Sequence, residues 1–468
     1  MMKLSEAASA MQAKLQGNDA VFSSVGTDSR NVSKGQLFVA LKGENFDGHD
    51  YAAQALAQGA AAVLVSNPNL GIEPALVVED TYQALGALAS YWRAKFAIPV
   101  IAITGSNGKT TVKEMILAIL VAKAGRENAV HATVGNLNNH IGLPLTLLKL
   151  HTDHQFSVLE MGMSHLGEIE YLSCIAKPTV AVINNAGTAH IGEVGSRENI
   201  AKAKGEIFAG LDALGVAVIN ADDAYADYWI GLNSARNVLT FSLKNAADVT
   251  ATYVELESLS QINLTTRQGT VSFSLAVLGA HNISNAVAAS AVAVALGVSN
   301  ADIARGLSGF GGVKGRLQRK AGLNGAKLID DTYNANPDSM RAAIDVLAQQ
   351  AGEKLLVLAD MGELGVNAKN MHAEIGQYAK AAGLTHLFCL GELSTEIARA
   401  FGAGASHYAT PEDLVAVVEP LMIENTTVLV KGSRFMKMER VIDLLEAKSG
   451  AVASIIASDL QKIQREDQ

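Results

Sequence analysis

The fold is decided by one stretch, residues 99–111, which reads PVIAITGSNGKTT. Its first five residues are apolar and mostly β-branched, which predicts a buried strand. The glycines that follow predict a tight turn into a helix, where backbone N–H groups and the helix N-terminus face a phosphate. Lys109 would then neutralise phosphate oxygens, and the Thr110 hydroxyl would ligate Mg²⁺. Ile103 stands where the standard motif has glycine. Because that glycine is missing, the prediction of a phosphate-binding loop rather than an ordinary βα turn rests on the strand before the motif and the helix after it.

Buried strands continue on the C-terminal side of this stretch. They are expected at Ser157–Glu160, Thr179–Asn184 and Val216–Asn220. Helical patterns lie between them, and that alternation favours a parallel sheet. From Asp248 to Gly279 the apolar residues alternate with a period of two, which predicts a small antiparallel addition. A hinge is expected at Gly309–Gly312.

The same rhythm of strands and helices appears on both sides of this central unit. On the N-terminal side, short apolar runs precede a connecting helix over Tyr82–Phe96; the runs are Leu37–Leu41, Ala61–Val65 and Ala75–Val78. Beyond the hinge, further strands indicate a smaller, doubly wound domain of the Rossmann type. They are expected at Lys327–Asp330, Leu355–Ala359, His386–Leu390 and Thr427–Val430. We therefore expect an α/β protein of three domains, 1–82, 83–312 and 313–468.

Composition limits the function classes. The 468 residues include 37 Lys and Arg against 46 Asp and Glu, a net charge of −9, which does not attract nucleic acid or anionic lipid. The two cysteines, Cys174 and Cys389, are far apart, so we expect no disulfide framework and a reducing, cytoplasmic location. Neither a secretory signal at the N-terminus nor an apolar run long enough to span a bilayer is visible.

Several polar residues leave predicted strands or lie on helical patterns. Glu160 at a strand end suits Mg²⁺, although a lone carboxylate there is more often a solvated edge charge. His190 is a metal ligand or an ordinary loop histidine. Lys202 and Lys204 lie on a helix whose default interpretation is a solvated charged face. Asn282 and Asn285, in the run HNISNA, lie three residues apart, so both side chains would point from one helix face toward a ligand. Alternatively, Asn282 caps the helix.

The order of these motifs along the chain resembles the Mur ligase family. The matching segments, from the N-terminal TDSR onward, are TGSNGKTT, EMGM, NNAGTAHIG, AKAKGEIF, NADD, GAHNISNAVAA, GR, IDDTYNANPDSM and VLVKGSRFMKME. The resemblance implies an ADP-forming amide-bond ligase of peptidoglycan synthesis. It also implies three domains: an N-terminal α/β domain that binds a UDP-sugar, a central P-loop ATPase domain and a C-terminal Rossmann-like ligase domain.

The resemblance also implies roles for individual residues. Lys109, Glu160, His190 and Lys204 would be catalytic. The metal ligands would be Thr110, Glu160, His190 and Lys204, holding two Mg²⁺ ions, with Lys204 carbamylated and Lys202 as the weaker candidate. ATP would be bound by Gly105, Ser106, Asn107, Gly108, Lys109, Thr110, Thr111, Asn282, Asn285, Arg316 and Asp331.

Within the family, the chain resembles the members that add D-alanyl-D-alanine to UDP-N-acetylmuramoyl-tripeptide. The substrate-binding residues would be Ser29, Arg30, Lys42, Asp47, His49, Asn136, Asn138, Asn139, Asn334, Asn336, Lys431 and Ser433. The Asp-Asn-Pro-Arg motif of diaminopimelate-adding relatives is absent, which favours the dipeptide. The alternatives are a related ligase with another acceptor, such as a folylpolyglutamate synthase, and a P-loop switch or motor protein. We expect a monomer that binds neither nucleic acid nor membrane.

Overall fold

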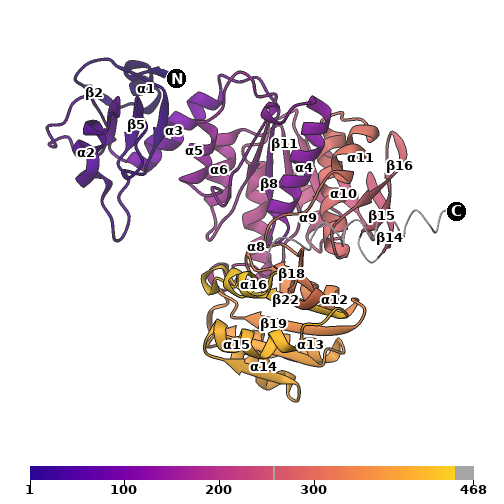
Figure 1. Ribbon diagram of the computed structural model, residues 1–468. Helices are drawn as coiled ribbons and strands as arrows, with labels where there is room; N and C mark the ends of the chain where they lie inside the picture. The colour runs from indigo at the N-terminus through magenta and orange to yellow at the C-terminus, as the bar shows by residue number, and fades with distance from the viewer. Residues whose placement is uncertain (257–258, 448–468) are drawn as a thin grey trace.

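The computed structural model describes residues 1–256 and 259–447. Its strands form three large sheets that follow one another along the chain, and Figure 1 shows the N-terminal domain beside the central domain and the C-terminal domain below it. These sheets have five, nine and six strands, so the protein is a three-domain α/β protein. Among the described residues, no helix is long and apolar enough to cross a membrane.

The N-terminal domain is a five-stranded sheet in the order β2-β7-β6-β5-β4, in which only β2 runs antiparallel to its neighbour. Its central strands are wholly buried, as their apolar sequences predict. Its elements are β1 (Met2–Lys3), α1 (Leu4–Met11), β2 (Lys14–Gln16), β3 (Val21–Phe22), β4 (Ser24–Gly26), β5 (Gln36–Val39), α2 (Ala52–Ala57), β6 (Ala62–Val65) and β7 (Ala75–Val77).

The connecting helix, α3 (Thr81–Arg93), begins where Asp80 accepts hydrogen bonds from the backbone N–H groups of Tyr82 and Gln83. It packs against α1 on one side and against two helices of the central domain on the other. One apolar cluster therefore runs from Leu4 in the first helix through Leu88 to Leu172 in the central domain. The predicted boundary between residues 82 and 83 falls inside this helix.

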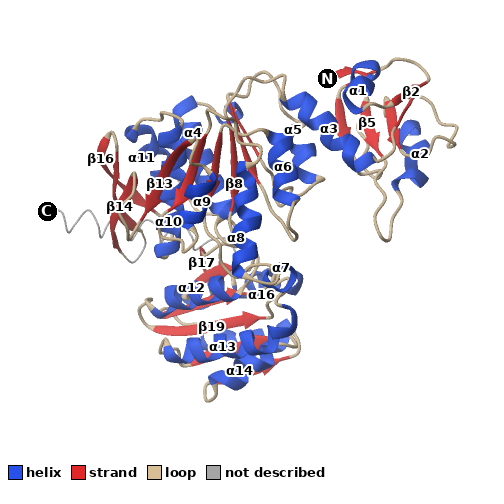
Figure 2. Ribbon diagram, turned by 180° about the vertical axis from the view of Figure 1, so that it is seen from behind, coloured by secondary structure: helices blue, strands red, loops and turns tan. Residues whose placement is uncertain are grey.

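The central domain has nine strands in the order β16-β15-β14-β13-β12-β11-β8-β10-β9. Figure 2 shows helices on both faces of this sheet. Its elements are β8 (Val100–Thr104), α4 (Lys109–Ala124), β9 (Val130–Ala132), α5 (Gly142–Leu147), β10 (Phe156–Glu160), α6 (Glu168–Ala176), β11 (Val180–Ile183), α7 (Ile191–Val194), α8 (Arg197–Gly205), β12 (Val216–Asn220), α9 (Ala226–Leu232), β13 (Asn237–Ser242), β14 (Val249–Glu255), β15 (Ser260–Thr266), β16 (Gly269–Leu275), α10 (Ala280–Ala295) and α11 (Asn300–Ser308).

The antiparallel addition lies at the β16 edge of this sheet. The strands β14, β15 and β16 pair antiparallel with one another, and β14 joins the parallel part through β13. Alternation in the sequence predicted the antiparallel strands. It did not predict β13 or the edge strand β9. The expected hinge is only partly a linker, because Phe310 is buried in the central core while Gly312 adopts a positive φ of 88°.

The C-terminal domain is a six-stranded sheet in the order β17-β18-β22-β19-β20-β21, parallel except for β17. Apolar clusters cover both faces of this sheet. Its elements are β17 (Gln318–Ala321), β18 (Lys327–Asp331), α12 (Pro337–Ala348), β19 (Glu353–Ala359), α13 (Ala368–Ala381), β20 (His386–Leu390), α14 (Ser394–Phe401), β21 (Ala405–Tyr408), α15 (Pro411–Val418), β22 (Thr426–Lys431) and α16 (Glu439–Leu445). The end of the predicted third domain, residues 448–468, lies outside the described residues.

Candidate active site

The phosphate-binding loop connects β8 to α4, as the sequence predicts. Gly108 adopts a φ of +81°, which a residue with a side chain rarely adopts. A Cβ atom on Gly108 would lie 2.4 Å from Oδ1 of Asn285 and 2.5 Å from Nδ2 of Asn184. The loop therefore requires glycine both for its backbone conformation and for its close packing against these two side chains.

Lys109 is the first residue of α4. Its Nζ donates a 2.7 Å hydrogen bond to the backbone oxygen of Gly105 in the same loop. Burial lowers the pKa of Lys109, and the charge of Arg316 lowers it further, whereas Glu160 opposes the shift. An anionic phosphate placed over the loop would compete with the Gly105 carbonyl for this cation, because the charge-assisted hydrogen bond is the stronger one.

Glu160, at the C-terminal end of β10, is buried beside the loop with two side-chain partners. Thr110 Oγ1 donates to Glu160 Oε2 at 2.8 Å, and Asn138 Nδ2 donates to Oε1 at 2.8 Å. Arg316 from the C-terminal domain donates to Thr110 Oγ1 at 2.9 Å. Neighbouring ligands of an octahedral Mg²⁺ lie about 3 Å apart, given metal–oxygen distances of about 2.1 Å. The hydroxyl and carboxylate therefore fit a Mg²⁺ ion in both chemistry and spacing.

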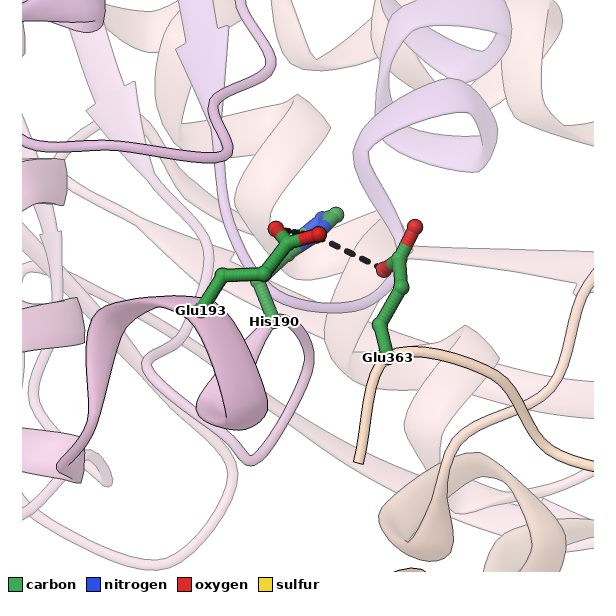
Figure 3. A group of neighbouring side chains, drawn as sticks. All are labelled: His190, Glu193 and Glu363. Carbon is green, nitrogen blue, oxygen red and sulfur yellow. Dashed lines mark ion pairs between the residues drawn. The ribbon is translucent and has the colours of Figure 1, made fainter. Parts of the chain in front are cut away.

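His190 lies immediately before α7, with a positive φ of 63°. Its Nδ1 is 2.8 Å from Oε2 of Glu363 and 3.5 Å from Oε2 of Glu193. Figure 3 shows that Glu193 approaches the ring from its own segment, whereas Glu363 reaches it from a loop of the C-terminal domain. Within residues 1–256 and 259–447, these three are the one group of at least three His, Cys, Asp or Glu ligand atoms lying within 4.8 Å of one another.

The two candidate lysines of α8 differ sharply in exposure. Lys202 is exposed, whereas only 2% of Lys204 is exposed. Burial holds the pKa of Lys204 well below its usual value, the charge of Lys109 lowers it further, and Asp223 opposes the shift. The helix therefore does not present both lysines to solvent, and the default interpretation of a solvated charged face fails for Lys204.

The asparagines that follow the phosphate-binding loop form a connected chain. Asn184 Nδ2 donates to Asn285 Oδ1 at 2.9 Å, and Asn285 Nδ2 donates to Asn282 Oδ1 at 3.1 Å. Gly279, not Asn282, occupies the N-cap position of α10, so the capping alternative is wrong. The amide side chains instead pack behind the loop, where both helix residues line the cleft described below.

Asp331 at the end of β18 is buried and paired with Lys431 at the end of β22. Lys431 Nζ lies 2.6 Å from Asp331 Oδ2 and also donates to the backbone oxygen of Asn334. Burial raises the pKa of Asp331, while the neighbouring Lys431 charge opposes the rise. Asp331, predicted to bind ATP, and Lys431, predicted to bind substrate, therefore contact each other directly.

A cleft of about 810 Å³ lies between the central and C-terminal domains. It brings together most of the predicted site residues. Those that line it are Ser106, Asn107, Gly108, Lys109, Thr110, Thr111, Asn136, Asn138, Asn139, Glu160, His190, Asn282, Asn285, Arg316, Asp331, Asn334, Asn336 and Lys431. Gly105, Lys204 and Ser433 do not line it. Ser433 is buried, where its hydroxyl accepts from Gly362 N–H and donates to the Ala335 oxygen.

The five predicted residues of the N-terminal domain lie outside this cleft. Ser29, Arg30, Lys42, Asp47 and His49 are not among its lining residues. Arg30 pairs with Asp28 and holds the pKa of that carboxyl at about 2. Asp47 accepts from the His49 backbone N–H, and His49 Nε2 accepts from the Ser66 N–H at 2.9 Å, so both side chains also maintain the local loop.

Sequence reasoning missed the acidic residues that connect the domains. Asp338 Oδ2 accepts hydrogen bonds from the backbone N–H and hydroxyl of Thr188, at 2.7 and 2.8 Å. Glu363 contacts His190 from the loop that follows β19. Both carry a signal in the sequence: Asp338 lies in the first turn of a helix, and Glu363 follows a buried strand. Local patterns do not show that either one reaches another domain.

A phosphate-binding loop, a buried carboxylate beside it and a cleft closed by a second α/β domain define a P-loop enzyme that acts between two domains. Three family models match the chain: "Mur ligase family, catalytic domain" over residues 21–93, "Mur ligase middle domain" over 103–293 and "Mur ligase, glutamate ligase domain" over 315–434. The chain belongs to the Mur ligase family, as its motifs predicted.

Individual relatives match over almost the whole chain. The UDP-N-acetylmuramoyl-tripeptide–D-alanyl-D-alanine ligase of Escherichia coli (strain K12) is 43% identical over 95% of this chain and 98% of its own length. A crystal structure of MurF from Acinetobacter baumannii superposes with a TM-score of 0.89 at 38% identity, covering 95% of this chain and 98% of that one. The MurF ligase from Thermotoga maritima, in complex with ADP, gives 0.81 at 30% identity, covering 90% and 96%.

Proposed function

We propose that the protein joins D-alanyl-D-alanine to UDP-N-acetylmuramoyl-tripeptide in an ATP-dependent reaction that forms the pentapeptide precursor of peptidoglycan. The observation that carries this proposal is the likeness to a ligase of that name across all three domains, at 43% identity over 95% of the chain. The cleft supports it, because the phosphate-binding loop and the C-terminal domain face each other there.

A carboxylate must be activated before it condenses with an amine. The terminal carboxylate of the tripeptide attacks the γ-phosphorus of ATP, the bond to the β–γ bridging oxygen breaks, and ADP and an acyl phosphate form. The unprotonated amine of the dipeptide then attacks the acyl carbon. The tetrahedral intermediate expels inorganic phosphate and leaves the new amide. Lys109 at the loop neutralises charge on the transferring phosphoryl group.

Thr110 and Glu160 would hold Mg²⁺, since their oxygens lie 2.8 Å apart beside the phosphate-binding loop. The ion would screen the charges of the phosphates and the attacking carboxylate. His190, which lines the cleft, would hold a second Mg²⁺, and the part of Lys204 in that ion is implied by the family resemblance alone. Closure of the two domains over the cleft would exclude water, which would otherwise hydrolyse the acyl phosphate.

We assign the carbamylated lysine to Lys204 rather than Lys202. Burial lowers the pKa of Lys204 and so favours the neutral amine, and a neutral amine adds to carbon dioxide to give a carbamate and one proton. The exposed Lys202 has no such environment. With ¹³C-bicarbonate, the carbamate signal should be present in the parent protein and in Lys202→Ala, and absent in Lys204→Ala. A signal that survives Lys204→Ala would contradict the assignment.

The test of the function is phosphate release from ATP and Mg²⁺, with the UDP-linked tripeptide and D-alanyl-D-alanine added singly and together. Release should need both and should be accompanied by the mass of the pentapeptide product. Product with diaminopimelate or glutamate in place of the dipeptide would favour a related ligase. Release without either substrate would leave a generic ATPase and overturn the proposal.

We also propose that the protein is monomeric and acts in the cytoplasm. The mass of the protein in solution, measured by light scattering, checks the first of them. A mass of 48.9 kDa is expected for one chain.

A further inference from the structure

The loop between β11 and α8 carries His190 and is contacted at two points by the C-terminal domain. At the first point, Asp338 in the first turn of α12 accepts from both the backbone N–H and the hydroxyl of Thr188. The approach is close, because a Cβ atom on Gly187 would lie 2.4 Å from Asp338 Oδ2. Neither residue belongs to the phosphate-binding loop or to the predicted metal ligands.

At the second point, Glu363 contacts the same loop through its side chain and its backbone. Its Oε2 lies 2.8 Å from Nδ1 of His190, and its backbone oxygen accepts from Gly192 N–H at 3.1 Å. Gly365 packs against Gly192 so closely that its Cβ would lie 3.1 Å from the Gly192 Cα. Figure 3 shows the carboxylate of Glu363 reaching the imidazole across the domain boundary.

We propose that Asp338 and Glu363 are positioning residues that form a closure latch, meaning the contacts these two carboxylates make with residues 187–192. When the C-terminal domain closes, Asp338 fixes the backbone at Thr188. Glu363 then brings its carboxylate to Nδ1 of His190. The carboxylate, 2.8 Å from Nδ1, holds in place a ring that also lines the cleft. Histidine ligands commonly have a carboxylate on the second nitrogen, and such partners affect metal affinity.

His190 itself supports this assignment. It adopts a positive φ of 63° although it is not glycine, so its conformation depends on the residues packed around it. Glu193 also faces the imidazole, but at 3.5 Å and from the same segment as His190. Glu193 therefore stays with His190 whatever the arrangement of the domains, whereas Glu363 can reach the ring only from the C-terminal domain.

The inference deepens the proposed function, because it takes His190 as a metal ligand of the ligase. The test of the latch needs nucleotide but no acceptor. The latch can therefore be disproved while the proposed function stands. Cys174 is exposed in the central domain and Cys389 is buried, so one probe can be attached to the native thiol. Glu412→Cys on the exposed side of α15 supplies the second probe position in the C-terminal domain.

The experiment measures the distance between the two probes in the presence of ADP and Mg²⁺ for Asp338→Ala, Glu363→Gln and the matched control Glu193→Gln. The parent protein and the control should show the short distance of the closed arrangement. The two latch variants should shift the population toward longer distances and weaken Mn²⁺ binding, measured by titration, by about 10- to 100-fold. Unchanged distances in both latch variants, or an equal shift in the control, would overturn the proposal.

Two milder variants keep the test decisive if Asp338→Ala disturbs folding. Thr188→Val removes only the hydroxyl donor, and Asp338→Asn retains one acceptor oxygen for the backbone N–H of Thr188. Both should shift the distance distribution in the same direction as Asp338→Ala but less far, with an unchanged thermal midpoint. A merely structural role would lower the midpoint and leave the distance alone, which would also contradict the proposal.

Discussion

The central domain meets its two neighbours through interfaces of different kinds. Toward the N-terminal domain it shares a continuous apolar cluster that includes Leu88 of α3 and Leu172 of α6. Toward the C-terminal domain the contacts are largely polar, for example Arg316 with Thr110 and Asp338 with Thr188, and they surround a cleft. Apolar burial is non-directional and costly to open, whereas polar partners can exchange with water. We therefore expect the first interface to be permanent and the second to open and close.

The largest effect should come from the cleft. Lys109→Ala removes the cation that faces the transferring phosphoryl group, so turnover should fall by about 10³-fold or more. Phosphate release with both substrates measures the loss. The lysine belongs to no apolar core cluster but donates to the Gly105 carbonyl, so the unfolding midpoint should fall only modestly. Lys123→Ala, at the exposed end of the same helix, is the control and should retain activity. Comparable activity in Lys109→Ala would refute the role of the loop.

The next effect tests the permanent interface. Leu88 is fully buried in the cluster shared by the N-terminal and central domains. Leu88→Ala should reduce the free energy of unfolding by about 2–5 kcal/mol, because it leaves a cavity. Denaturant titration should show both domains losing structure together. Gln83→Ala, on the exposed face of the same helix, should cost little. A separate unfolding transition for the N-terminal domain would mean that the apolar interface does not join the two domains permanently.

Acid should destabilise the central domain through one buried histidine. His131 on β9 is buried, and burial lowers its pKa from 6.5 to about 4. The unfolded chain therefore binds the proton first, and this group loses stability as pH falls from about 6.5 to 4. The loss is at most about 3 kcal/mol, at 1.36 kcal/mol per unit of pKa difference. Unfolding free energies measured at pH 7 and 4.5 should differ less in His131→Gln. Equal pH dependence in parent and variant would contradict this origin.

The smallest effect concerns an ion pair at the surface of the permanent interface. Glu6 of α1 pairs with Lys95 just beyond α3, and the hydrogen bond from Lys95 lowers the pKa of Glu6. Its contribution is present above about pH 4.5 and is lost as the pH falls below that value. Because both side chains are partly exposed, Glu6→Gln should cost less than about 1 kcal/mol. High salt should cancel the difference between parent and variant. A larger cost would mean that polar contacts stabilise this interface too.

Sequence reasoning succeeded where a local pattern determines the structure. Apolar runs placed β8, β10, β11 and β12, and the glycines of the phosphate-binding loop placed Lys109 at the start of a helix. It failed for short or polar strands such as β9 and β17, whose sequences lack a long apolar run. Partners such as Asn336 with Asn107, 229 residues apart, follow only from the arrangement of the domains.

The candidate site shows the same limit. Motif order picked out most of the polar residues that line the cleft, and their individual roles there stay predictions. The choice of Lys204 over Lys202 came from the motif, and burial supports it, because Lys204 is buried and Lys202 is exposed. Asp338 and Glu363 escaped attention because each has a sufficient local explanation, a helix start in one case and a loop after a strand in the other.

The missing side chain of Gly108 has a consequence for how the sequence can vary. Two amides that come from distant parts of the chain, Asn184 and Asn285, meet in the space that a Cβ atom would fill. No single exchange at position 108 can be accommodated while both amides stay in place. The three positions are therefore expected to change as a set or not at all in the descendants of this sequence, although they are scattered across the gene that encodes it.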